Sequence, residues 1–130
     1  MTTTLTIDGS AVHDIPSLYA ELNRVLMPDE DWTLGESLDA LDDLLYGGFG
    51  VLDGSAPVSI CWQDHGSARD ALGLEATLAY YQAKLARPEV YSVSVAEAAI
   101  TALRAGTGPT YFELVLQVFE SHPNIDLILV

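Results

Sequence analysis

The stretch Pro57-Val58-Ser59-Ile60-Cys61-Trp62 decides the fold class, because it is a short, mostly apolar run of the length and composition of a β-strand. Residues 3–7 are rich in β-branched side chains, and residues 125–130 form an apolar terminal run, so both are also predicted to be strands. Helical patterns separate the three runs. Strands that alternate with helices predict an α/β protein with a small parallel sheet covered by helices. The runs at 57–62 and 125–130 are the candidates for its centre.

Two helices are predicted between the first two strands. Residues 15–26 carry apolar side chains at helical spacing, with Pro16 in the first turn. Residues 38–46 repeat the pattern, with Ser37 as the expected N-cap and Gly47-Gly48 as the stop. Leucines form the apolar stripe of this second helix. Its outward face is then expected to consist of Asp39, Asp42, Asp43 and Tyr46.

The segment 67–106 is predicted to be mostly helical. One amphipathic helix is expected to close before Pro88, and Ser94-Val95-Ala96-Glu97 has the pattern of a capping box that opens another, ending at Gly106. Thr110-Tyr111-Phe112-Glu113 is a second capping box, which begins the last helix. No repeat, low-complexity segment or linker is present, so residues 1–130 are expected to form a single domain.

The overall charge excludes several classes of partner. The chain has 130 residues with 19 acidic and 5 basic side chains, for a net charge of -14. This argues against direct binding to nucleic acid or to an anionic membrane, because both need clustered Lys and Arg. No apolar run approaches the ~18 residues of a membrane helix, and the start of the chain lacks a signal-peptide pattern. The single cysteine, Cys61, is expected to be a buried structural thiol in a cytoplasmic protein.

The acidic residues are unevenly distributed. Residues 1–64 hold 12 of them with Arg24 as the only base, and seven fall between Asp29 and Asp43. Asp39 and Asp43 are helical i,i+4 neighbours, and their repulsion costs the helix a few tenths of a kcal/mol. This pattern favours a cation supplied by another molecule, although a merely solvated acidic face remains the alternative. Trp32, beside the acidic loop, is either an interface anchor or a core residue.

Enzymatic function finds little support. The three histidines, at positions 13, 65 and 122, show no metal-ligand spacing, and neither a phosphate-binding glycine loop nor a nucleophile elbow is present. The aspartates of the second helix do not have the spacing of a calcium loop. We therefore expect no catalytic residues, no metal and no cofactor. A small hydrolase that uses His65 beside Asp64 is the weakest hypothesis.

Gly35-Glu36-Ser37-Leu38-Asp39-Ala40-Leu41-Asp42-Asp43-Leu44-Leu45 resembles the second helix of the barstar family, the intracellular inhibitors of the ribonuclease barnase. The opening strand, the helix start Ile15-Pro16-Ser17-Leu18, the strand at 58–62, and the final helix and strand at 115–119 and 125–129 fit the same plan. The resemblance covers about two thirds of the chain. It implies a three-stranded parallel sheet packed by helices, with residues 67–106 as a helical insertion.

The resemblance also implies a function and a set of contact residues. The chain would be a monomeric immunity protein that blocks the active site of a small, basic, secreted microbial ribonuclease in a 1:1 complex. Asp43 would mimic the RNA phosphate, and Asp39 is the second principal aspartate of the family. The implied contact residues are Trp32, Thr33, Leu34, Gly35, Glu36, Asp39, Asp42, Asp43, Tyr46 and Glu120.

Several of these positions depart from the family pattern. Thr33 and Leu34 stand where the family has aromatic residues, with Trp32 displaced by one place. Asp42 replaces a tryptophan, and Glu120 lies beside the position of the family's late acid. The alternative function is therefore a barstar-like module that neutralises a different basic toxin or regulates another basic protein.

Overall fold

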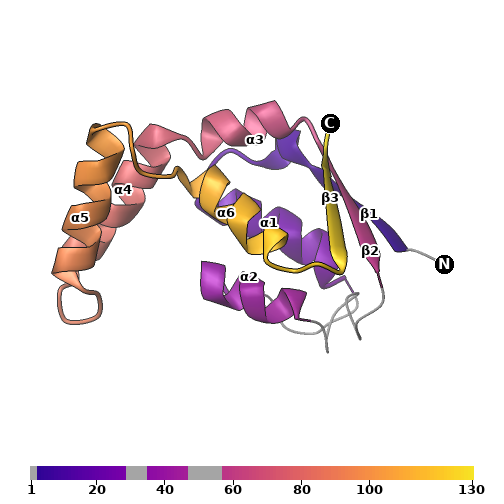
Figure 1. Ribbon diagram of the computed structural model, residues 1–130, viewed down its shortest axis with the longest axis horizontal. Coiled ribbons are helices and arrows are strands. Elements are labelled where there is room, and N and C mark those ends of the chain that lie inside the picture. The colour runs from indigo at the N-terminus through magenta and orange to yellow at the C-terminus, as the bar shows by residue number, and fades with distance from the viewer. Residues whose placement is uncertain (1–2, 29–34, 47–56) are drawn as a thin grey trace.

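The computed structural model describes residues 3–28, 35–46 and 57–130, and its strands form a three-stranded parallel sheet (Figure 1). The strands are β1 (Thr3–Asp8), β2 (Val58–Gln63) and β3 (Ile125–Leu129), in the order β1-β2-β3. The parallel sheet expected from the sequence is confirmed. β3 forms an edge, however, so only the run at 57–62 is central, and the outer half of β3 is exposed accordingly.

The described ranges contain six α-helices. They are α1 (Ile15–Leu26), α2 (Leu38–Leu45), α3 (His65–Ala71), α4 (Leu74–Leu85), α5 (Val93–Arg104) and α6 (Tyr111–Glu120), with a 3-10 turn, η1 (Gly9–Ala11), after β1. The predicted helices at 15–26 and 38–46 are confirmed to within one residue, and the segment 67–106 is helical as expected. None of these helices is long and apolar enough to cross a membrane.

Two of the three predicted N-caps form as expected, and the third is shifted along the chain. Ser37 Oγ accepts the amide of Ala40 at 3.0 Å, and Thr110 forms the expected reciprocal capping box with Glu113. The predicted box at Ser94 is wrong. Ser92 is extended and its Oγ accepts the amide of Val95, so the helix begins two residues earlier and Ser94 is already helical.

One face of the sheet carries the core. Ile7, Ile60 and Trp62 are fully buried and belong to one apolar cluster with the leucines of α1, α2 and α6. Figure 1 shows these three helices together on one side of the strands. Alternate residues of β2 point to the other, less covered face, which leaves Cys61 only half-buried. The expectation of a buried thiol is therefore wrong, because Cys61 is intermediate in burial.

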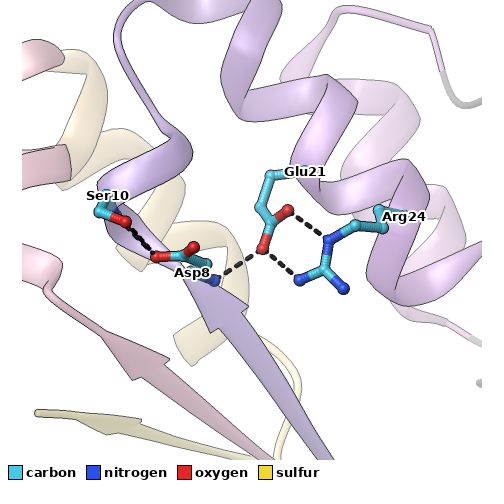
Figure 2. A network of polar contacts seen from close by, with 4 residues as sticks. All are labelled: Asp8, Ser10, Glu21 and Arg24. Carbon is cyan, nitrogen blue, oxygen red and sulfur yellow. Dashed lines mark hydrogen bonds and ion pairs between the residues drawn. The ribbon is translucent and has the colours of Figure 1, made fainter.

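The end of β1 is fastened to α1 by a buried carboxylate. Glu21 accepts the backbone amide of Asp8 at 2.6 Å, and the Arg24 guanidinium donates to both Glu21 oxygens at 2.6 and 2.7 Å (Figure 2). The Ser10 hydroxyl and amide hold the pKa of Asp8 below its ordinary value. The only base of residues 1–64 is therefore committed to an internal contact.

The helices α4 and α5 form a hairpin that stands apart from the sheet beyond α1 and α6 (Figure 1). Its anchor is Thr77, which is buried and whose Oγ1 accepts the amide of Tyr111 at 2.8 Å and donates to the carbonyl of Gly73 at 2.7 Å. The next amide of α6, that of Phe112, donates to the carbonyl of Leu72 at 3.2 Å. The first amides of α6 are thus satisfied by the α3–α4 segment, which fixes the base of the hairpin.

Candidate functional site

The candidate site is built on α2, whose apolar side fixes the direction of its acidic side. Leu41 and Leu44 are fully buried in the core, and α2 packs against α6. Asp39 and Asp43, on the other side of the helix, are exposed as expected. Neither forms an ion pair with any base in the described parts of the chain. Asp39 also lies in the first turn of α2, where the helix dipole favours an anion.

Asp42 does not share this free, outward position. Its Oδ1 lies 2.7 Å from Nε2 of His122, just after α6, and the side chains are 37% and 4% exposed, respectively. An ionised carboxylate only accepts hydrogen bonds, so Nε2 of the imidazole is the donor. The expectation that Asp42 faces outward beside Asp39 and Asp43 is therefore wrong. The packing of α2 against the end of α6 turns this carboxylate toward the buried histidine.

Tyr46 ends α2 and marks one limit of the acidic face. Its side chain is 73% exposed, as the sequence predicts. Its ring meets the His122 imidazole edge-on, with 4.7 Å between the ring centroids. The His122 contact therefore holds both Asp42 and Tyr46. This contact supports a large exposed aromatic ring next to the free carboxylate of Asp43.

The opposite limit of the acidic face is a cleft between the start of α2 and the α4–α5 hairpin. It has a volume of about 420 Å³. Its walls are formed by Glu36, Ser37, Leu38, Asp39, Tyr80, Tyr81, Lys84, Tyr91, Val95 and Leu114. The segment 67–106, which the sequence left without an assigned role, therefore borders the acidic helix and contributes to the same surface.

A column of tyrosines links this cleft to the core. The hydroxyl groups of Tyr19 and Tyr111 are 2.7 Å apart and buried, and the ring of Tyr80 lies 5.0 Å from that of Tyr111. Burial raises the pKa of Tyr19 to about 12. Burial and the hydrogen bond to Tyr19 raise the pKa of Tyr111 as well. Both hydroxyls are therefore neutral at physiological pH, and they serve as a rigid support behind Tyr80.

The remaining predicted contact residues fall in three places. Gly35 and Glu36 are exposed immediately before α2. Glu120 is exposed at the end of α6, where it lines a groove with residues of β3 such as Leu127. The predicted contacts Trp32, Thr33 and Leu34, and the helix stop at Gly47-Gly48, lie outside the described residues.

The structure also includes site residues that sequence reasoning missed. His122 follows a helix with no distinguishing pattern, and its partner Asp42 is 80 residues away. Tyr80, Tyr81 and Lys84 did carry a signal, because residues one turn apart on a helix are neighbours. Their relation to Asp39 was not visible from spacing.

The other histidine that the sequence offers as a candidate is His65. His65 Nδ1 lies 2.9 Å from the carbonyl oxygen of Val130, so its ring contacts the end of the chain. No group of three or more His, Cys, Asp or Glu side chains in these ranges converges in a way that would hold a metal ion. Comparison of the chain with protein-family models and with curated proteins finds no match.

Proposed function

We propose that this chain is an inhibitory binding protein of the barstar type, which blocks the active site of a small basic ribonuclease inside the cell that makes the enzyme. One observation carries the proposal: Asp39 and Asp43 lie one turn apart on a firmly packed helix, exposed, and without an ion-pair partner among the described bases. The three-stranded parallel sheet agrees with the architecture that the resemblance implies.

The proposed mechanism is electrostatic mimicry of the substrate. A ribonuclease pocket is cationic because it must bind and stabilise phosphate. Asp43 enters that pocket in place of a phosphate, and Asp39 pairs with a second cationic group nearby. The net charge of -14 attracts the basic enzyme at long range and raises the association rate above the ~10⁶ M⁻¹s⁻¹ of unsteered protein pairs.

The proposal assigns supporting roles to the other side chains of α2. Asp42 orients the helix through His122 and contributes to binding only indirectly. Tyr46 supplies an exposed aromatic ring at the edge of the contact, where a tyrosine combines a large apolar area with a hydroxyl group. Glu36, at the opposite end, extends the acidic face toward the cleft.

The test measures how strongly single variants bind barnase, a small basic ribonuclease, at low salt. Truncating one member of a buried charge pair costs about 2–5 kcal/mol, so Asp43→Ala should raise the Kd at least about 30-fold, and Asp39→Ala somewhat less. Asp70→Ala is the matched control, because it removes an exposed aspartate from α3. Unchanged affinity of both α2 variants would refute the assigned roles.

A second candidate is a module of the same type whose target is a different basic toxin or regulatory protein. The cleft beside Asp39 favours it, because the hairpin wall of this cleft, which includes Tyr80 and Lys84, lies outside the barstar resemblance. Co-expression separates the two candidates. Rescue of cells from a toxic ribonuclease supports the first, whereas capture of a basic protein from lysate, unaffected by added ribonuclease, supports the second.

A further inference from the structure

We propose that the cleft between α2 and the α4–α5 hairpin, hereafter the tyrosine cleft, binds an arginine side chain of the basic partner protein. The cleft is the one lined by Glu36 and Asp39 on one wall and by Tyr80, Tyr81 and Tyr91 on the other. This inference rests on the proposed function, because it takes the partner to be a basic protein that contacts α2. It adds a second contact that the resemblance does not supply.

The aromatic wall of the tyrosine cleft already holds a cation. The ammonium of Lys84 lies 4.5 Å from the ring centroid of Tyr80, 5.0 Å from that of Tyr91 and 5.9 Å from that of Tyr81. These distances are within the ~6 Å range in which a ring attracts a positive charge. The three rings are thus arranged as a receptor for a cation, and Lys84 occupies part of it.

The charges of the tyrosine cleft leave one negative charge without a counterpart. Among the described residues, Glu36 and Asp39 stand on one wall, and Lys84 is the only base that lines the cleft. No ion pair joins Lys84 to a carboxylate in the described ranges. An added guanidinium would balance the second carboxylate. Its planar, weakly hydrated group also stacks on aromatic rings better than an ammonium does.

The cleft is large enough for one long side chain. Its volume of about 420 Å³ falls in the range of roughly 300–1,000 Å³ that is typical of sites for small ligands. Val95 lines the cleft and is 65% exposed, and Val90 and Val93 are exposed close by in sequence. These apolar side chains offer a surface for the methylene stem of an arginine and for its neighbours in the partner.

The tyrosine cleft is also preorganised. Tyr80 stacks edge-on against Tyr111, whose backbone amide is bound by the buried hydroxyl of Thr77. Tyr81 stacks edge-on against Tyr80, with 5.1 Å between the ring centroids. The aromatic wall is therefore tied to α6 and the core, so less conformational freedom is lost when a ligand binds.

The experiment titrates the full chain with the peptide acetyl-Gly-Arg-Gly-amide and follows the side-chain NMR signals of the tyrosines. The same peptide with citrulline in place of arginine has nearly the same shape without the charge. We expect saturable shifts at Tyr81 and Tyr91 with the arginine peptide, and at least two-fold weaker binding with citrulline. Equal binding of the two peptides, or shifts confined to other parts of the chain, would overturn the proposal.

Two variants sharpen the test. Tyr91→Leu should weaken the arginine peptide about two- to five-fold. Lys84→Met should strengthen it, because it removes the competing ammonium. Arg104→Met is the matched control, since it removes one positive charge from a groove that shares no residue with the tyrosine cleft and should leave peptide binding unchanged. A weaker peptide affinity in Lys84→Met would contradict the assignment. So would a dimer of the chain that dissociates in Tyr91→Leu, because a second copy would then be the occupant.

The outcomes separate this inference from the function on which it rests. If the arginine peptide binds the tyrosine cleft but the chain inhibits no ribonuclease, the proposed function fails and the cleft still recognises a cation. If the chain inhibits barnase but the peptide leaves Tyr81 and Tyr91 unshifted, the inference fails and the proposed function stands.

Discussion

Replacement of Asp42 by alanine tests whether this aspartate stabilises the fold, in contrast to Asp43, which is proposed to bind the partner. The variant leaves Nε2 of His122 without its carboxylate at a side chain that is only 4% exposed. An unsatisfied buried donor costs about 1–3 kcal/mol. Asp42 itself is 37% exposed, so water partly replaces it, and we expect a loss of about 1–2 kcal/mol. For a domain of this size that corresponds to a fall in Tm of about 4–8 °C.

The matched variant is Asp43→Ala, one residue further along the same helix. It removes the same charge but breaks no contact with the described residues. It also relieves the repulsion from Asp39 and introduces a better helix former, each of which adds a few tenths of a kcal/mol. We therefore expect its stability to equal or exceed that of the unmodified chain. Its affinity for the ribonuclease should nevertheless fall far more than that of Asp42→Ala.

The assay is urea denaturation at pH 7, followed by circular dichroism, with the free energies compared at a common m-value. Asp42→Asn serves as the conservative variant, because its amide oxygen still accepts a hydrogen bond from His122 and should restore most of the lost stability. If Asp42→Ala proves as stable as Asp43→Ala, the Asp42–His122 contact does not hold the helix. The division of roles along α2 would then be refuted.

Three further predictions concern the scaffold. Gly9→Ala should be strongly destabilising in urea denaturation, because a Cβ there would lie 2.3 Å from the carbonyl oxygen of Asp64. Thr77→Val should cost about 1–3 kcal/mol by leaving the buried amide of Tyr111 unpaired, whereas Thr77→Ser should retain most of the stability in the same measurement. The raised pKa of Tyr19, about 12, favours the folded state below pH 10 and loses that effect as the pH rises from 10 to 12. The urea midpoint should therefore fall over this range, and it should fall less in Tyr19→Phe.

Local signals in the sequence were sufficient for most of the secondary structure. The capping pair Thr110 and Glu113 forms as predicted because its hydrogen bonds depend only on residues three apart. The prediction of Ser94 as an N-cap was wrong because a second serine, Ser92, lies two residues earlier and caps the helix instead. The partial exposure of Cys61 reflects helices on only one side of the sheet (Figure 1), which no local pattern specifies.

The candidate site was less predictable because its contacts are long-range. The exposed positions of Asp39 and Asp43 follow from helical periodicity alone. The hydrogen bond between Asp42 and His122 does not follow from periodicity, because it depends on how α2 packs against the end of α6. The tyrosine cleft likewise requires the α4–α5 hairpin to stand beside the start of α2, and sequence spacing carries no information about that placement.

Asp39 is the residue at which the two proposed contacts meet, and this restricts the kind of partner that fits. Its side chain lines the tyrosine cleft and lies one helical turn from Asp43. A partner that inserted only a flat basic surface would reach Asp43 but leave the cleft empty. A partner that makes both the Asp43 contact and the tyrosine-cleft contact must present a cationic pocket for Asp43. One helical turn away, it must also present a projecting arginine. Because α6 packs against α2 and is hydrogen-bonded to the base of the hairpin, we expect the spacing of these two features to be set by the folded chain and not by an adjustment on binding.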